Sequence, residues 1–211
     1  MIYLSCLAHP KLKTYLSRTH KITEIESTHS VSHGIGTHPD LYLCDLGSRV
    51  FRSDPAKLFP GYPKEVRYNA ACTGRYFIHN LKYTDPELLM AAREMAMTTV
   101  HVNQGYAKCN TVIVDERSVI TSDRGMIGPL RDAGMSVLQV APGQVVLPGY
   151  SYGFLGGTSG KVEDEIVFHG NLSLHPDHKE IAQFIQGRGL KVKFFKDFPL
   201  TDIGSILWQR G

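Results

Sequence analysis

The feature that most constrains this chain is an order of elements that recurs along it: two strands, a helix and a further strand. The clearest copy occupies residues 110–140. Its pattern predicts strands, a helix and a strand over residues 111–114, 118–121, 122–133 and 135–140. Ser122 or Asp123 caps the helix, because a short side-chain oxygen accepts the free N–H groups of a first helical turn. Gly134 marks its end, and Pro129 inside it predicts a kink or a shorter helix.

Three other segments repeat the strand, helix and strand of this order, at residues 75–102, 165–195 and, as a weaker copy, 2–25. Asp85 followed by Pro86 is a strong helix start, and we expect that helix to run to about Met97. A hairpin from Leu41 to Phe51 and a strand from Asp202 to Leu207 are the remaining pieces. Self-similarity of this size outweighs any single strand assignment, because it indicates a repeated structural unit.

Small or polar residues begin each clear unit, which suggests that the first strands converge on a crowded axis. They are Ala71-Cys72-Thr73, Lys108-Cys109-Asn110, Gly157-Thr158-Ser159 and Gly204-Ser205. The pattern predicts an α/β fold of five ββαβ pseudo-repeats around an axis, in one domain over residues 1–211. The last strand would pair with the N-terminal unit and close the ring, which removes exposed sheet edges. The alternative is an open α/β sheet, but a hairpin before each helix favours the ring.

Several runs of residues carry a resemblance to a known fold. They are residues 105–111, 150–160, 169–172, 175–177 and 199–206. Together they resemble an uncharacterised bacterial family with the pentein fold, which guanidino-group-modifying enzymes and the ribosome anti-association factor share. The resemblance is most specific from about residue 69 onward, and it implies a five-fold αβ-propeller with a pocket along its axis. It implies no activity directly, because fold and function separate readily.

Two cysteines are the candidate catalytic residues. The resemblance implies a late cysteine nucleophile, but the matching segment reads Asp202-Ile203-Gly204-Ser205 and no cysteine follows Cys109. A relocated nucleophile at Cys109 or Cys72 is one hypothesis, because both begin a repeat where the axis is expected. Its candidate partners are His33, His79, His101, Asp45 and Asp202. The alternative is that both thiols are small buried packing residues.

Polar residues expected near the axis are the candidate ligand-binding residues. They are Asn69, Arg75, Lys108, Asn110, Ser159, Asp202, Asp45 and His33. Arg or Lys would suit a carboxylate or phosphate ligand, whereas Asp would suit a guanidinium. The sign of the pocket therefore stays open. The glycine-rich segment 156–161 does not match a phosphate-binding loop, because the required spacing of Gly, Lys and Ser or Thr fails.

Charge and spacing argue against several classes of partner. The net charge of +3 is small and the basic residues are scattered, so we expect no nucleic acid. No apolar stretch is long enough for a membrane span, so we expect a cytoplasmic protein. The four cysteines lack paired spacing, and we expect no metal and no cofactor. His29, His33 and His38 are expected in a mobile surface loop that acts as a lid. The oligomeric state is open.

Two functions remain. The first is a protein whose axial pocket binds, or hydrolyses, a small polar metabolite of amidine, guanidino or amino-acid type. As an enzyme it would be a cysteine-dependent hydrolase or transferase acting on C–N bonds. The alternative is a non-catalytic interaction module, like the anti-association branch of the fold.

Overall fold

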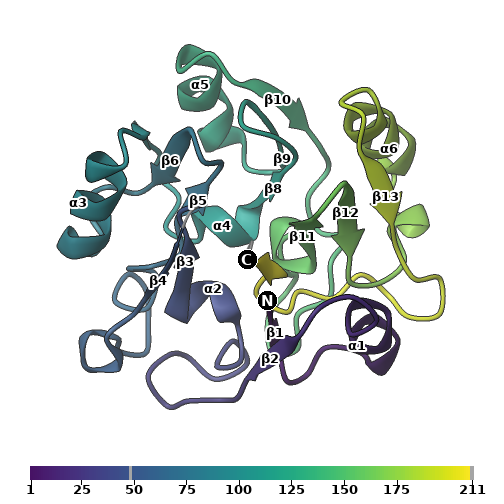
Figure 1. The fold of residues 1–211 in the computed structure, drawn as a ribbon, viewed down its shortest axis with the longest axis horizontal. Helices are drawn as coiled ribbons and strands as arrows, with labels where there is room; N and C mark the ends of the chain where they lie inside the picture. Colours follow the sequence, from purple (N-terminus) through teal and green to yellow (C-terminus); the bar gives the residue numbers. More distant parts are fainter. Residues whose placement is uncertain (48, 210–211) are drawn as a thin grey trace.

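Five small sheets make up the mixed α/β structure in the computed structural model, which describes residues 1–47 and 49–209. The strands, sheet by sheet, are β14 (Leu207–Trp208), β1 (Ile2–Ser5) and β2 (Ile22–Ile25); β3 (Leu43–Asp45) and β4 (Val50–Arg52); β5 (Ala71–Cys72), β6 (Tyr76–His79) and β7 (Thr98–His101); β8 (Thr111–Ile113), β9 (Ser118–Thr121) and β10 (Ser136–Gln139); β11 (Ser159–Val162), β12 (Glu165–Phe168) and β13 (Lys191–Lys193). Figure 1 shows the sheets around the middle of the molecule.

The helices fall into an outer and an inner group. They are α1 (Pro10–Leu16), α2 (Pro39–Tyr42), α3 (Pro86–Glu94), α4 (Ala107–Asn110), α5 (Arg124–Asp132) and α6 (His178–Gln186), with the 3-10 turns η1 (Pro55–Lys57), η2 (Gly156–Thr158) and η3 (Leu172–Leu174). In Figure 1 α1, α3, α5 and α6 lie at the periphery, whereas α2 and α4 lie near the middle. Among the described residues, no helix is long and apolar enough to cross a membrane.

The predicted order of elements is confirmed in the unit that β8 begins. Strand β8 pairs antiparallel with β9, and β9 pairs parallel with β10 after α5. Asp123 caps α5 by accepting from the backbone N–H of Gly125 at 2.8 Å. Gly134 follows with a φ of 84°, a left-handed conformation that glycine adopts without a steric penalty. Pro129 is accommodated within the helix. The sheets that begin with β5 and β11 repeat this antiparallel-then-parallel pairing.

Three element boundaries differ from the sequence expectation. The strand expected over residues 202–207 is confined to Leu207–Trp208, because Gly204 and Ser205 have left-handed φ values of 71° and 73°. It does pair antiparallel with β1, as expected. Helix α3 ends at Glu94 rather than near Met97, with Ala96 at a φ of 55°. The hairpin begins at Leu43, since the preceding residues form the turn α2.

Each outer helix packs its apolar face between two neighbouring sheets. Ile181 and Ile185 of α6 lie in a cluster with Ile120 of β9 and Phe168 of β12. Residues spaced by four lie on the same helix face, so this pair is buried together. Burying each such side chain contributes about 1.5–3 kcal/mol. The apolar contacts therefore join each sheet to the next and leave the ends of the first strands to meet in the middle.

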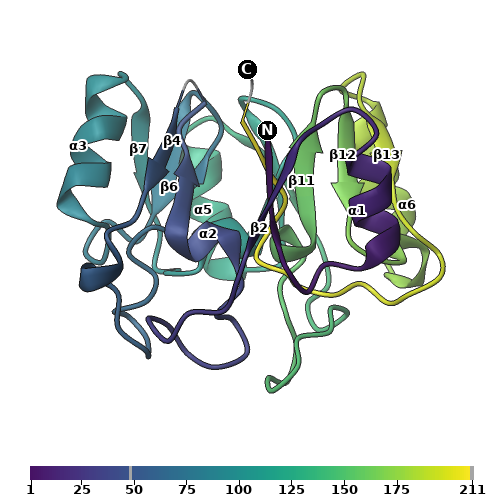
Figure 2. The ribbon, with the colours of Figure 1, turned by 60° about the horizontal axis from the view of Figure 1, so that its bottom comes forward.

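The two ends of the molecule differ in their loops. At one end lie the β3–β4, β5–β6 and β8–β9 hairpin connections together with Met1 and Gln209, and the Met1 ammonium donates to the Gln209 carbonyl at 2.8 Å. We call this the hairpin end. The segments 26–38 and 141–155 extend at the opposite end, which we call the loop end (Figure 2). They contact each other there, since the Tyr150 hydroxyl donates to the His33 carbonyl.

Candidate functional site

Short chain segments that precede strands converge in the middle of the molecule. Asn69, Cys109, Gly157 and Ser205 each lie two residues before a strand, namely β5, β8, β11 and β14. Asp40 lies three residues before β3, so all five sheets contribute. The polar side chains gathered here form what we call the central cluster: His38, Asp40, Asn69, Lys108, Cys109, Asp202 and Ser205.

Glycines allow this close convergence. A Cβ on Gly156 would lie 2.5 Å from both the carbonyl oxygen of Cys109 and the amide nitrogen of Thr111. A Cβ on Gly157 would overlap the carboxyl group of Asp202. Both glycines belong to η2, so the glycine-rich segment brings backbone against backbone at the centre. The glycine-rich segment therefore has a packing role, in agreement with its failure to match the spacing of a phosphate-binding loop.

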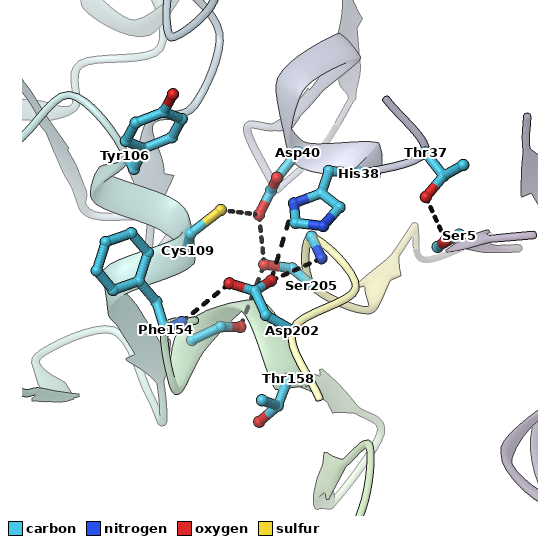
Figure 3. A network of polar contacts seen from close by, with 12 residues as sticks. Ser5, Thr37, His38, Asp40, Tyr106, Cys109, Phe154, Thr158, Asp202 and Ser205 are labelled. Atoms are coloured by element: carbon cyan, nitrogen blue, oxygen red, sulfur yellow. Dashed lines mark hydrogen bonds and ion pairs between the residues drawn. The ribbon is translucent and has the colours of Figure 1, made fainter. Parts of the chain in front are cut away.

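Asp40 lies at the heart of the cluster with an exposed fraction of 1%. Its Oδ2 accepts hydrogen bonds from the Ser205 hydroxyl at 2.6 Å and from the Cys109 thiol at 3.1 Å (Figure 3). Its Oδ1 is buried and has no hydrogen-bond partner among the described residues. A buried carboxylate oxygen without a donor is costly, so this atom marks a place for a ligand donor.

Asn69 and Lys108 donate further hydrogen bonds to the Cys109 thiol and the Ser205 hydroxyl, respectively. The Asn69 amide donates to Cys109 Sγ at 3.3 Å, while its Oδ1 accepts from the backbone N–H groups of Lys108 and Cys109. The Lys108 ammonium donates to Ser205 Oγ at 2.9 Å. A continuous chain of hydrogen bonds therefore runs from Lys108 through Ser205 to Asp40 and Cys109.

Asp202 and His38 complete the cluster. The Asp202 carboxylate accepts from the backbone N–H groups of Phe154 at 2.9 Å and Gly204 at 3.0 Å. His38 Nδ1 lies 3.8 Å from Asp202 Oδ1 (Figure 3). The expectation that His38 belongs to a mobile surface loop is wrong, because this side chain is buried and stands directly before α2. His29 and His33 are exposed.

Burial governs the protonation of the cluster. It raises the pKa of the Cys109 thiol well above its ordinary value, and the neighbouring Asp40 raises it further, so the thiol is neutral at pH 7. Burial also raises the pKa of Asp40, lowers that of Lys108 and lowers that of His38 to about 4. It raises the pKa of Asp202 to about 6, against the opposing backbone hydrogen bonds. Each of these shifts favours the neutral form of the group, because burial penalises a charge.

The cluster also offers a set of metal-ligating atoms. One donor atom from each of His38, Asp40 and Cys109 lies within 4.8 Å of the other two. All three residues are buried. No metal was expected from the sequence, because the cysteines lack paired spacing. His38 and Asp40 are neighbours in the chain, and only the fold brings Cys109 to them.

Aromatic rings surround the loop-end side of the cluster. Tyr106 and Phe154 have ring centroids 6.3 Å apart, and both rings flank Cys109 and Asp202 in Figure 3. Tyr62 and Tyr152 extend this row outward, at 6.0 Å from Tyr106 and 6.3 Å from Phe154. We call these four residues the aromatic cover. Tyr152 and Phe154 belong to the loop-end segment 141–155.

Buried Glu65 ties the aromatic cover to two loops. Its Oε1 accepts from the Tyr106 hydroxyl at 2.6 Å, and its Oε2 accepts from the backbone N–H groups of Ser32 and Gly61. These hydrogen bonds lower the pKa of Glu65 against the effect of burial, so it is a carboxylate at neutral pH. The Glu65 carboxylate therefore joins Tyr106 of the cover to the loop segments at Ser32 and Gly61.

A separate cavity of about 320 Å³ opens at the hairpin end. Its lining includes Asp45, Cys72, Glu116, Lys161 and Trp208. Lys108 also lines it, and is the residue that the cavity shares with the central cluster. We call this cavity the hairpin-end pocket.

Comparison with known proteins places the chain in a family. A sequence profile described as "Family of unknown function (DUF6873)" matches residues 51–207, well over half of the chain. The chain belongs to this family. No curated protein and no solved structure matches it. The family description carries no activity, so the resemblance to the pentein fold stays a prediction, and the chemistry must be argued from the site.

The residues predicted from the sequence separate into three groups. Asn69, Lys108, Cys109 and Asp202 lie in the central cluster, within the range that the family profile matches. Asp45 and Cys72 line the hairpin-end pocket. Four other side chains are part of neither the central cluster nor the lining of the hairpin-end pocket: Arg75, Asn110, Ser159 and His33.

That last group has local structural contacts. Arg75 is exposed and lies over the Tyr76 ring, and His33 is exposed in a loop. The Asn110 amide donates to the Tyr106 carbonyl, and the Ser159 hydroxyl donates to the Gly156 carbonyl. We therefore leave these four out of the functional argument.

Cys72 and Cys109 were expected at equivalent positions of their repeats, and this is wrong, because the two positions differ by three residues. Cys109 stands two residues before its strand, where the β5 unit has Asn69 rather than Cys72. Cys72 Sγ instead lies 3.5 Å from Cys44 Sγ. His79, another candidate partner, is buried elsewhere between Thr84 and the Gly105 carbonyl.

Asp40 was missed as a candidate because no repeat of the sequence pattern points to it. It follows His38-Pro39 outside the range matched by the family profile. The available signal was local: His38-Pro39-Asp40 stands shortly before β3, as Lys108-Cys109 stands before β8. Ser205 was noted only as a small residue at the start of a unit.

Proposed function

We propose that the chain is a pentein-like αβ-propeller, in one domain over residues 1–211, whose central cluster binds a small cationic nitrogen compound. The compound class is an amidine, a guanidino compound or a cationic amino acid. The observation that carries the proposal is Asp40 Oδ1, a fully buried carboxylate oxygen without a hydrogen-bond donor among the described residues. An N–H group of such a ligand supplies that donor, and the ligand charge matches the carboxylate.

The charges around Asp40 support a cation over an anion. Burial raises the pKa of Asp40 and lowers that of Lys108, so each charge is costly unless a partner compensates it, and His38 is neutral at pH 7 because burial lowers its pKa to about 4. A cationic ligand beside Asp40 and Asp202 supplies that compensation to their carboxylate forms. A carboxylate or phosphate would add a further negative charge in a buried environment, which is strongly unfavourable.

In the stronger form of the proposal Cys109 is the nucleophile of a C–N bond hydrolysis. Its thiol already donates to Asp40 Oδ2, which accepts the proton as Sγ bonds to the amidine carbon. The C–N bond then breaks and the leaving nitrogen departs as ammonia or an amine with that proton. Water attacks the thioester-like carbon, breaks the C–S bond and returns a proton to Sγ. The net change replaces C–N by C–O and releases an ammonium.

The ligand would enter from the loop end by displacement of the aromatic cover. Tyr106 and Phe154 are half-buried, and Tyr152 is 45% exposed. Their ring faces attract a cation, with a contribution of about 0.5–2 kcal/mol for each well-placed ring. The cover therefore combines exclusion of water with selection for positive charge.

A thermal-shift panel tests the proposal. Amidines, guanidino compounds, amino acids and carboxylates are each added to the wild type, to Asp40→Asn and to Asp45→Asn. A ligand at a hundred times its Kd stabilises the fold by about 2.7 kcal/mol, which raises the Tm by roughly 5–10 °C. We expect a cationic compound to do this for the wild type and Asp45→Asn and to fail with Asp40→Asn. A carboxylate hit, or an equal shift with Asp40→Asn, would contradict the proposal.

The second candidate is a non-catalytic interaction module. It is favoured by the closure of the cluster, in which the Cys109 thiol is neutral and donates to a neighbouring carboxylate instead of facing a cavity. A folded wild type that shows no shift with any cationic compound would move the choice to this candidate. Turnover of a panel compound that stops in Cys109→Ser would establish the stronger form of the first.

A further inference from the structure

Three chemically different donors meet at Asp40. The imidazole of His38, the carboxylate of Asp40 and the thiol of Cys109 have donor atoms that lie within 4.8 Å of one another. Their exposed fractions are 3%, 1% and 2%. We propose that His38, Asp40 and Cys109 form a binding site for a thiophilic divalent cation such as Zn²⁺, with Asp40 Oδ1 or Oδ2, Cys109 Sγ and one His38 ring nitrogen as ligands.

The spacing of these atoms is close to what a tetrahedral ion requires. Ligands at zinc distances of 2.0–2.3 Å are separated from each other by roughly 3.4 Å. Cys109 Sγ and Asp40 Oδ2 are already 3.1 Å apart. The limit of 4.8 Å for all three pairs means that side-chain movements of about an ångström complete the geometry. Backbone rearrangement is not needed.

The unpartnered oxygen supports an occupant independently of the spacing. Asp40 Oδ1 is buried and accepts no hydrogen bond from the described residues. When Asp40 turns this oxygen toward an ion, Oδ2 can keep the hydrogen bond from Ser205. Metal-binding carboxylates are commonly oriented in this way, by a hydrogen bond to the oxygen that does not bind the ion.

The donor set favours zinc or cobalt over magnesium or calcium. Thiolate and imidazole suit Zn²⁺ and Co²⁺, whereas hard ions prefer oxygen ligands alone. Three protein ligands leave the fourth position open, as in zinc sites that bind an exchangeable group. Asp202 Oδ1 lies 3.8 Å from His38 Nδ1.

Charge balance is compatible with a divalent ion despite the nearby lysine. Binding replaces the Cys109 S–H bond by a metal–sulfur bond and releases one proton. The ion then meets a thiolate and the Asp40 carboxylate, which together match its two charges. Ser205 separates Lys108 from Asp40, since it accepts from the ammonium and donates to the carboxylate. The ammonium therefore stays outside the ligand set.

The inference uses the residues of the proposed function but does not depend on it. A cation on Cys109 and Asp40 excludes an amidine from the same atoms, so the ion would act as a competitor of the organic ligand. The two outcomes are separable. An ion can bind where no amidine does, and an amidine can bind where no ion does.

Cobalt titration tests the site, because a thiolate ligand gives Co²⁺ an intense charge-transfer absorption. Metal-free, reduced protein is titrated with Co²⁺ as wild type, Cys109→Ser and Cys72→Ser, with the fold of each checked by circular dichroism. We expect one equivalent with a thiolate band for the wild type and Cys72→Ser. We expect the band to vanish in Cys109→Ser, with affinity at least about tenfold lower. His38→Gln should weaken binding while the band remains.

Absence of a stoichiometric thiolate band in the wild type would overturn the inference, as would a band that disappears in Cys72→Ser and persists in Cys109→Ser. If Cys109→Ser does not fold, X-ray absorption of the zinc-loaded wild type decides the matter. One sulfur neighbour with nitrogen and oxygen neighbours supports the site. A zinc shell without sulfur, or with two sulfurs, contradicts it.

Discussion

The central cluster and the hairpin-end pocket lie along the same middle of the molecule and share Lys108, yet they differ in kind. In the cluster, buried polar side chains that precede strands of four sheets satisfy one another, except at Asp40 Oδ1. In the pocket, Asp45, Cys72 and Glu116 line a cavity that opens between hairpin turns. The comparison shows that the open cavity and the buried carboxylate oxygen without a hydrogen bond lie in different regions, because Asp40 Oδ1 belongs to the closed cluster.

Replacing a glycine by alanine should give the largest difference in the free energy of unfolding between the central cluster and the hairpin-end pocket. Gly156→Ala puts a methyl group against the backbone of Cys109 and Thr111, so we expect a loss of at least about 4 kcal/mol or no folded protein. Gly74, which lines the pocket, has open space but a φ of 88°, so Gly74→Ala should cost only about 1–2 kcal/mol of backbone strain. Urea unfolding measures both. Similar losses would mean that the centre is not tightly packed.

Lys108→Met should cause the second-largest loss of stability, because it removes the side chain that the central cluster and the hairpin-end pocket share. Ser205 loses its donor and the buried carboxylates lose a compensating charge, so we expect a loss of about 3 kcal/mol. Glu116→Gln, on the exposed rim of the pocket, should change stability by less than about 0.5 kcal/mol. A neutral result for Lys108→Met in the same unfolding experiment would show that the cluster does not need its cation.

The pH dependence of stability provides a comparison with a fully satisfied buried residue. His79 lies outside both regions, and burial lowers its pKa to about 4. Between pH 6.5 and 4 the unfolded chain binds the proton more readily, so stability falls as the pH falls, by up to about 3 kcal/mol from this residue. His79→Gln should flatten this slope in unfolding curves measured at about pH 7, 5.5 and 4.5.

Asp202 in the cluster contributes to the pH dependence of stability with the opposite sign to His79. Burial raises its pKa to about 6, so the folded state binds its proton more readily and this contribution favours the fold as the pH falls from about 6 toward 4. Asp202→Asn should therefore steepen the loss of stability in acid, whereas His79→Gln reduces it. Equal changes of slope in the two variants would contradict this assignment of opposite signs.

The smallest expected effect is a difference in thiol labelling. Cys72 lines the pocket and is half-buried, whereas Cys109 is 2% exposed behind the aromatic cover. A small alkylating reagent should modify Cys72 at least about ten times faster than Cys109 in the native protein. Mass spectrometry of the peptides at several times measures both rates. Faster labelling of Cys109 would show that the cover opens readily.

The sequence predicted the repeated unit well, because its signals are local. Asp123 before a helix and Gly134 after it are capping residues whose effect does not depend on distant contacts. The strand over residues 202–207 failed for the converse reason. The left-handed backbone at Gly204 and Ser205 lets the chain pass close to His38, a contact with no local signature.

The candidate site was predicted only in part. Cys109, Asn69, Lys108 and Asp202 belong to recognisable units, and the structure brings them together. Asp40 could not be singled out, because its importance comes from tertiary contacts with Ser205 and Cys109, far away in the chain. The sequence also could not separate the closed cluster from the open pocket, since both use residues near the first strands.

The most direct test of the account is a crystal structure of the protein with the cationic compound that raises its Tm most in the panel. The account predicts a ligand nitrogen within hydrogen-bond distance of Asp40 Oδ1, close to Cys109 Sγ and beneath a displaced aromatic cover. A ligand found instead in the hairpin-end pocket, between Cys72 and Trp208 with the central cluster unchanged, would contradict it.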